Sequence, residues 1–185
     1  MKLTFKWLNE YVNLDGLTAE QIADRLSMLG LEVDAVVHMS RGLEGLRTAR
    51  IRKVQPHPDA DRLTVCEVEI GPEIIQVVCG APNAREGLLT AIALPGVALP
   101  DGMKIKKAKV RGQESLGMLC SARELGLSEE HGGILEISGN IGSGVDLGQA
   151  LGLDDVMIEI DLTPNRPDCA SVLGIAREVA GFAGR

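Results

Sequence analysis

The chain has 185 residues, 45% of them hydrophobic, and a net charge of −7 from 19 basic and 26 acidic residues. This composition supports a packed core and excludes global disorder, and the length suits one or two compact domains. Aromatic residues make up only 2% of the chain, and none lies between Val12 and Gly181. Stacking of nucleobases on aromatic rings is therefore excluded for the whole middle of the chain.

Cysteine spacing and hydropathy predict the compartment. The four cysteines are scattered without a C-x-x-C pair, which is typical of a reduced cytosolic protein rather than a disulfide scaffold. The longest uncharged apolar run, Leu88–Pro100, has 13 residues and contains Pro95 and Gly96, so it is too short and too broken to span a bilayer. No signal peptide is evident. We expect a cytoplasmic protein with no membrane partner.

The first elements expected along the chain are a helix and a strand. Thr18 and Gln21 have the spacing of a capping box, and apolar residues follow at helical intervals as far as Leu29. Gly30 is typical of a helix end, and Leu31–Val37 is expected to be a strand.

The middle of the chain is predicted to be rich in β-structure. Short apolar or β-branched runs alternate there with Pro, Gly and Asp. Five or six short strands at this spacing favour a closed or partly closed barrel, which avoids exposed sheet edges. Ser121 and Glu124 predict one capped helical turn that ends at Gly126. The expected strands are Thr48–Val54, Leu63–Ile70, Ile74–Val78, Leu88–Ala93, Lys104–Val110 and Ile134–Ile137.

The C-terminal part returns to mixed structure. Met157–Leu162 alternates apolar and acidic residues and predicts a half-buried strand. Thr163–Asp168 contains two prolines and predicts a turn, and Ser171–Phe182 has helical spacing of its apolar residues.

No catalytic or metal centre is predicted. The chain lacks the P-loop lysine motif, the nucleophile elbow and the H-E-x-x-H motif, and its three histidines are far apart in sequence. No pair of cysteines or histidines has zinc-ligand spacing. The Gly142–Gly148 segment has the wrong glycine spacing for a dinucleotide loop and is expected to be a surface loop.

Basic side chains on the predicted strands are the strongest candidates for a binding site. Residues 41–123 carry 13 basic and 9 acidic residues, whereas residues 1–40 carry 3 and 6 and residues 124–185 carry 3 and 11. Cations on strands can neutralise phosphates, but lysines on an edge strand also prevent edge-to-edge pairing, and composition leaves both interpretations open. Without aromatic rings, a nucleic-acid site would depend on phosphate and 2′-hydroxyl contacts, which favours structured RNA. The candidate RNA-binding residues are Arg50, Arg52, Lys53, Lys104, Lys106, Lys107, Lys109 and Arg111.

Several strings in the middle resemble a known family. His57–Leu63 resembles the H-P-[ND]-A-D-[KR]-L turn of the tRNA-binding OB domains attached to several aminoacyl-tRNA synthetases, and Val77–Asn83 resembles that family's next motif. Lys106–Gly112 with Ser115–Ser121 is similar to its K-x-x-K-x-R-G…S-x-G-M-[LI]-C-S strand pair. Each string also has a structural interpretation, as a turn, a close backbone contact or part of the core.

The flanking segments extend the resemblance over essentially the whole chain. Trp7-Leu8, Gly30–Asp34, Thr163–Cys169 and Gly174–Ala180 resemble the bacterial phenylalanyl-tRNA synthetase β subunit. That resemblance implies an α+β fold: a small α/β domain split into residues 1–39 and 151–185, with an OB-fold β-barrel inserted at 40–150. Charge alone places boundaries near 40 and 123. The family's β subunit is several times longer, so the chain is expected to be an N-terminal fragment.

The resemblance also implies the function and the partners. The fragment is expected to hold or steer tRNA without catalysing a reaction and without a metal or cofactor of its own. In the whole α2β2 enzyme it would serve the ATP- and magnesium-dependent charging of tRNA(Phe), together with the α subunit and the rest of the β subunit. Two alternatives stay open: a free-standing tRNA-binding OB protein and a purely structural or protein-interaction domain.

Overall fold

The computed structural model describes residues 1–185, which form two compact units. The split unit consists of Met1–Arg41 and Asp154–Arg185, and the inserted unit consists of Gly42–Leu153. The change in charge near residue 123 is therefore not a domain boundary, because it falls inside the inserted unit. None of the helices combines the length and the hydrophobicity that a bilayer-spanning segment needs.

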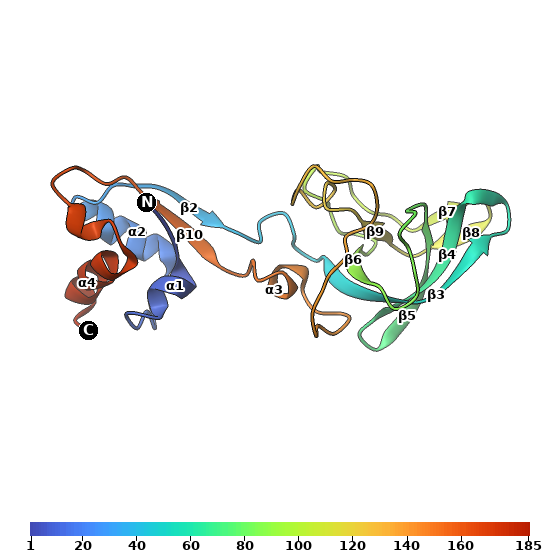
Figure 1. Ribbon diagram of the computed structural model, residues 1–185, viewed down its shortest axis with the longest axis horizontal. Helices are drawn as coiled ribbons and strands as arrows, with labels where there is room; N and C mark the ends of the chain where they lie inside the picture. The colour runs from blue at the N-terminus through green and yellow to red at the C-terminus, as the bar shows by residue number, and fades with distance from the viewer. The chain divides into compact units, whose positions relative to one another are not determined.

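The split unit is a three-stranded antiparallel sheet with helices packed on it (Figure 1). The strand order is β1-β10-β2, so the two halves of the unit are joined by backbone pairing of β10 with both N-terminal strands. Helix α2 contacts β2, β10 and α4, and α1 contacts β10 and α4. The elements are β1 (Lys2–Thr4), α1 (Phe5–Asn9), α2 (Ala19–Met28), β2 (Val33–His38), β10 (Val156–Ile160), the 3-10 helix η1 (Pro167–Cys169) and α4 (Val172–Ala183).

Local sequence signals explain where these helices begin. The hydroxyl of Thr18 accepts a hydrogen bond from the Gln21 amide (3.3 Å), and the Gln21 side chain accepts one from the Thr18 amide (3.0 Å), which confirms the predicted capping box. Ser171 caps α4 by accepting from the Gly174 amide (3.2 Å). No residue with a side chain fits in place of Gly174, because a Cβ would lie 1.9 Å from the Asp168 carbonyl oxygen where α4 meets η1.

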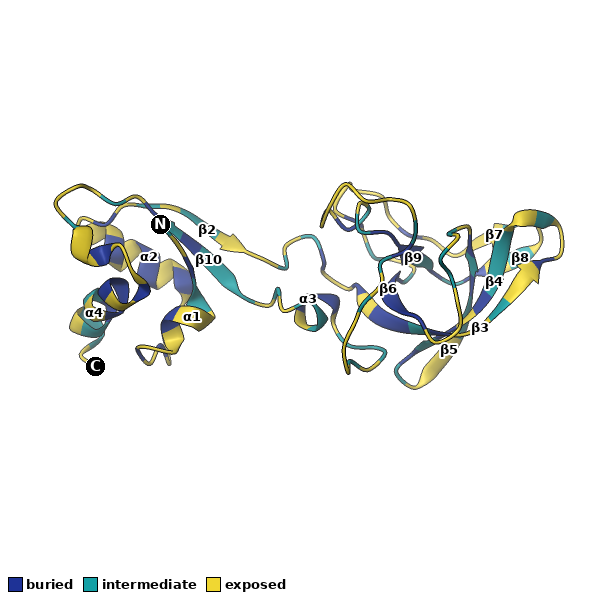
Figure 2. Cartoon of the chain, in the orientation of Figure 1, coloured by how far each residue is buried: buried dark blue, intermediate teal, exposed yellow.

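The inserted unit contains a five-stranded antiparallel sheet and a separate two-stranded hairpin. The sheet order is β5-β4-β3-β6-β9, and β5 also contacts β8 and β9. Apolar clusters lie on both sides of β6, since Ile92 belongs to one cluster and Ala91 to the other. All five residues of β6 are buried (Figure 2). The elements are β3 (Arg47–His57), β4 (Ala60–Ile70), β5 (Glu73–Cys79), β6 (Leu89–Ala93), β7 (Ala108–Val110), β8 (Gln113–Ser115), β9 (Met118–Cys120) and α3 (Leu147–Ala150).

Two predicted strands of the inserted unit are wrong in whole or in part. Of Lys104–Val110, only Ala108–Val110 is a strand; Lys104 forms an isolated β-bridge with Ala98, and the Ile105 amide donates to the Val97 carbonyl (2.9 Å). Ile134–Ile137 forms no strand, although Ile134 is buried in the core. The amides of Leu135 and Ile137 donate to Cys120 (2.8 Å) and Leu89 (2.9 Å), so this segment attaches to two different strands instead of pairing with one.

Candidate nucleic-acid interface

The predicted cations at the end of the 104–111 segment lie on a tight hairpin. Strands β7 and β8 pair from Ala108↔Ser115 to Val110↔Gln113, which leaves Arg111 and Gly112 as the two-residue connection. Both connecting residues have positive φ, +44° and +91°. This combination is the one found in type I′ hairpin turns, which match the twist of paired strands. Glycine meets this requirement without strain, whereas Arg111 is the only non-glycine residue of the chain with positive φ.

The tip of the hairpin is attached to the turn between β3 and β4. His57, at the end of β3, places Nε2 3.1 Å from the Val110 carbonyl oxygen. The Arg111 guanidinium donates to the Asp59 carbonyl (3.3 Å), which is a second hydrogen bond between the hairpin and this turn. A cavity of about 350 Å³ opens there, lined by Ala60, Asp61, Arg62, Leu63 and Arg111. Arg62 was missed as a candidate, although it lies within the His57–Leu63 string that carries the family resemblance.

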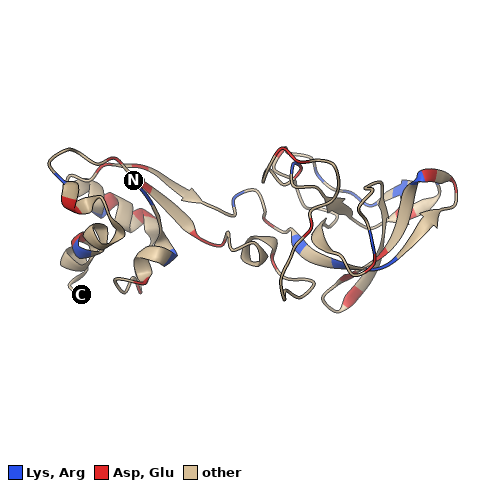
Figure 3. Ribbon diagram, in the orientation of Figure 1, with Lys and Arg blue, Asp and Glu red and all other residues tan.

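The five cations of this segment are all exposed. Figure 3 marks where Lys and Arg lie along the chain, in blue. Only Lys107 forms an ion pair, with Glu114 across the hairpin at 3.3 Å, and both side chains remain more than half exposed. Such an exposed ion pair contributes little to stability, so Lys107 can release Glu114 and bind a phosphate instead. The structure thus brings Lys104, Lys106, Lys107, Lys109 and Arg111 together on one short segment with a single acidic neighbour on the hairpin.

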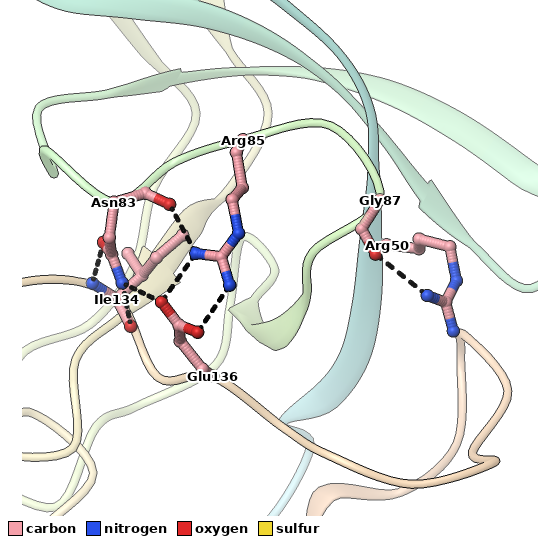
Figure 4. A network of polar contacts seen from close by, with 6 residues as sticks. All are labelled: Arg50, Asn83, Arg85, Gly87, Ile134 and Glu136. Atoms are coloured by element: carbon pink, nitrogen blue, oxygen red, sulfur yellow. Dashed lines mark hydrogen bonds and ion pairs between the residues drawn. The ribbon is translucent and has the colours of Figure 1, made fainter.

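The three candidates on β3 have different surroundings. Arg50 donates to the Gly87 carbonyl (3.0 Å; Figure 4). It also donates to the Ile141 carbonyl (3.2 Å), so its guanidinium connects two loops. Arg52 pairs with Glu69, which also accepts from the Ser143 hydroxyl (2.6 Å). Lys53 is exposed and makes no ion pair.

These β3 residues do not join the hairpin cations in one cluster. Arg50 precedes His57 by seven residues along β3, which corresponds to about 23 Å in an extended strand. The predicted set is therefore divided between the middle of β3 and the β7–β8 hairpin.

A polar network near Arg50 was not found from the sequence (Figure 4). Arg85 binds Glu136 through two hydrogen bonds of 2.7 and 2.6 Å. Asn83 donates to the Ile134 carbonyl and accepts from the Ile134 amide, both at 2.9 Å. Hydrogen bonds from Arg85 and Asn83 lower the pKa of Glu136 to about 2. The network fastens the strandless segment around Ile134 to the loop after β5, which is a structural role.

A group of potential metal ligands in the split unit is already occupied by an arginine. Asp168, Cys169 and Glu178 place ligand atoms within 4.8 Å of one another. The Arg166 Nη2 atom lies 2.9 Å from Asp168, 2.9 Å from Cys169 and 2.7 Å from Glu178, in the position that a cation would take. Hydrogen bonding to Arg166 lowers the pKa of Asp168 to about 2, and burial raises the pKa of the Cys169 thiol to about 11. These groups fit neither a metal site nor an activated nucleophile.

An exposed cationic hairpin on a β-rich unit offers a surface that suits a polyanion such as a nucleic acid. Residues 46–146 match the family model described as "Putative tRNA binding domain". The chain belongs to this tRNA-binding domain family.

Whole-chain relatives are β subunits of phenylalanine–tRNA ligase. The chain is 54% identical to the subunit of Desulfotalea psychrophila over all 185 residues, and 50% identical to that of Legionella pneumophila over 181 residues. It spans 23% of the length of each relative. Among solved structures, the MetRS related protein from Pyrococcus horikoshii aligns with 55% of this chain and 87% of its own, at 19% identity and a TM-score of 0.41.

Proposed function

We propose that the inserted unit binds tRNA through the β7–β8 hairpin and the adjoining β3–β4 turn. The observation that carries this proposal is the set of exposed cations at 104–111, which have almost no acidic partners, inside a chain of the tRNA-binding domain family. Arg62, beside Arg111 in the cavity between hairpin and turn, belongs to the same surface. Arg50 and Arg52 contribute less, because their guanidinium groups are engaged within the protein.

We further propose that the inserted unit is an OB-fold barrel, occupying about residues 40–150, within a small α/β domain formed by residues 1–39 and 151–185. The sheet order supports this proposal, because β3, β4, β5, β6 and β9 follow one another as the five strands of a Greek-key barrel, and β5 contacts β9 at the open side. OB-folds bind their ligands with the loops between strands 1 and 2 and between strands 4 and 5. Those loops would be the β3–β4 turn and the segment that contains the hairpin.

The proposed mode of binding is electrostatic. The inserted unit contains no aromatic residue, so bases have no ring on which to stack. Phosphate and ribose contacts then dominate, which favours folded RNA and gives steep salt dependence. The unit carries 12 basic and 14 acidic residues, so attraction would come from the hairpin surface and not from the net charge.

For the whole protein we propose the role of a phenylalanine–tRNA ligase β subunit. The chain would supply tRNA-holding and assembly functions at the N-terminal end of that subunit in an α2β2 enzyme of the cytoplasm. ATP, magnesium and phenylalanine would be handled by the α subunit and by the rest of the enzyme. Within this proposal the residues of the chain have structural and RNA-contacting roles.

Binding of bulk tRNA by the 185-residue chain tests the proposal. Affinity should fall steeply between 50 and 200 mM salt, by about tenfold or more if several phosphates are neutralised. Changing Lys106, Lys107 and Lys109 together to alanine should weaken binding about tenfold and reduce the salt slope. Replacing Lys2, Lys6 and Arg177 of the split unit by alanine alters the net charge equally and should leave affinity unchanged.

Two outcomes would contradict the proposal. Undiminished binding by the hairpin variant would exclude this surface as the contact. Absence of binding by the intact chain at low salt would favour the second candidate, a structural or protein-interaction domain, which the acidic balance of the inserted unit supports.

A further inference from the structure

His57 links the β3–β4 turn to the tip of the hairpin. It is only 5% exposed, and both ring nitrogens are engaged. The Asp59 amide donates to Nδ1 at 3.0 Å, while Nε2 lies 3.1 Å from the Val110 carbonyl oxygen. One imidazole thus bridges two segments that are about 50 residues apart in sequence.

The two contacts define the protonation state that the bridge needs. Because the Asp59 amide is a donor, Nδ1 has to offer a lone pair; because the Val110 carbonyl is an acceptor, Nε2 has to carry the proton. Only the neutral imidazole with its proton on Nε2 makes both bonds. A doubly protonated ring turns Nδ1–H towards the Asp59 N–H, and that contact is lost.

The rest of the hairpin is anchored on its β8 side. The Leu116 amide donates to the Gln76 carbonyl (2.9 Å), and the Gln76 side chain donates to the Glu114 carbonyl (2.9 Å). The Val78 amide donates to the Ser115 hydroxyl (3.1 Å). By contrast, the tip and the cationic β7 side are held by His57 and by the exposed Arg111–Asp59 contact.

We propose that His57 is a positioning residue for RNA: its neutral, bridging imidazole fixes the β7–β8 hairpin so that the cations of residues 104–111 face one ligand. The inference rests on the proposed tRNA binding at this hairpin. When the bridge is lost, the hairpin is correctly placed in only a fraction of molecules, and the apparent affinity falls by that fraction.

Two amide substitutions separate the two bonds. In His57→Gln the amide nitrogen takes the place of Nε2 and keeps only the contact with the Val110 carbonyl. In His57→Asn the amide oxygen takes the place of Nδ1 and keeps only the Asp59 contact. His131→Gln, at an exposed histidine of the same unit, is the matched control.

The test measures tRNA affinity of the 185-residue chain, together with amide hydrogen exchange of β7 and β8 without RNA. We expect His131→Gln and His57→Gln to bind tRNA within about twofold of the native chain, and His57→Asn to bind about three- to tenfold more weakly. Hairpin amides should exchange faster in His57→Asn than in the native chain or in His57→Gln.

The outcomes separate this inference from the proposed function. Unchanged hairpin exchange and affinity in His57→Asn, while the hairpin lysine variant loses binding, would overturn the inference and leave the proposed function intact. Faster hairpin exchange with unchanged affinity would overturn both, because the hairpin would then not contact RNA. Equal tRNA affinities of His57→Gln and His57→Asn would overturn the positioning role, because the contact with Val110 would then make no difference.

Discussion

Two fully buried threonines on neighbouring strands have different hydrogen bonding. Thr48 on β3 donates its hydroxyl hydrogen to the Gly142 carbonyl (2.8 Å) and accepts from the Val145 amide (3.0 Å). Thr90 on β6, opposite Ala49, has no hydrogen-bond partner for its hydroxyl. An unpaired buried hydroxyl costs stability, whereas the paired one supports the loop that it binds.

This contrast predicts opposite effects of the same substitution. Thr90→Val should raise the free energy of unfolding by about 1 kcal/mol, because it removes an unsatisfied polar atom at nearly constant volume. Thr48→Val should lower it by about 1–3 kcal/mol, because the Val145 amide loses its partner. Shifts of the urea unfolding midpoint at constant m-value measure both changes in the free energy of unfolding. A destabilised Thr90→Val variant would show that this hydroxyl has a partner in solution.

The Arg85–Glu136 pair predicts a pH dependence of stability. The pKa of Glu136 is lowered from 4.5 to about 2 in the folded state, so its ionised form stabilises the protein above the ordinary carboxyl range, and this contribution is lost as the pH falls towards 2. Glu136→Gln should therefore be less stable than the native chain at pH 7, with the difference shrinking between about pH 4.5 and 2. Urea unfolding across this range measures it, with Glu129→Gln, an exposed residue without an ion pair, as control. A difference that is constant with pH would contradict this account.

At the scale of elements, the sequence predicted the features that depend on interactions between residues close together in the chain. The Thr18 cap, the Ser121–Glu124 turn and the long β strands follow from side chains within a few residues of one another. The candidate site was predicted only as a list of cations, because sequence spacing shows neither that Arg50 binds the Ile141 carbonyl nor that Arg111 lies in a turn against Asp59. Both contacts join residues more than 50 positions apart, and tertiary packing decides them.

The hairpin turn offers a way to separate folding from binding. Arg111 is held at positive φ, a conformation that asparagine adopts more readily, and Asn-Gly is a favoured type I′ pair. Arg111→Asn should keep or increase the protection of the hairpin amides, while tRNA affinity falls about two- to fivefold and the log–log salt slope drops by about 1. Amide exchange and binding at several salt concentrations test both parts, with Arg177→Asn in the split unit as the matched loss of charge. Equal affinity in the two variants would exclude Arg111 as an RNA contact.

At the scale of the whole molecule, the organisation depends on where one compact unit interrupts another. The boundary near residue 40 is visible in composition, but the second is not, because residues 124–153 are acidic and still pack in the inserted unit. Leu147, for example, is fully buried in a cluster with Leu46, and its amide donates to the Leu46 carbonyl (3.0 Å). The distribution of charge along the sequence reflects the surface of the protein. Buried contacts such as this one decide to which compact unit a segment belongs.

The interruption predicts that each unit folds without the other. In the split unit β2 and β10 are antiparallel partners, and the Met39 amide donates to the Asp155 carbonyl (3.0 Å), so the chain leaves at Arg41 and returns at Asp154 close to the same point. Replacing residues 42–153 by a linker of about four glycines should therefore give a cooperatively folding α/β protein, since closing so short a loop costs little entropy. The core it would retain includes buried side chains from both halves, such as Leu26 and Ile158.

The isolated segment 42–153 should fold as well and retain the tRNA affinity of the whole chain within about twofold, because its apolar clusters and the hairpin contacts are internal to it. Residues 1–41 alone should stay unfolded, because β1 and β2 are joined only through β10. Circular dichroism, urea unfolding and tRNA titration of the three polypeptides measure these outcomes. A linked split unit that fails to fold would mean that the inserted unit supplies stability across the boundary, and tRNA affinity that requires the split unit would move part of the RNA contact away from the hairpin.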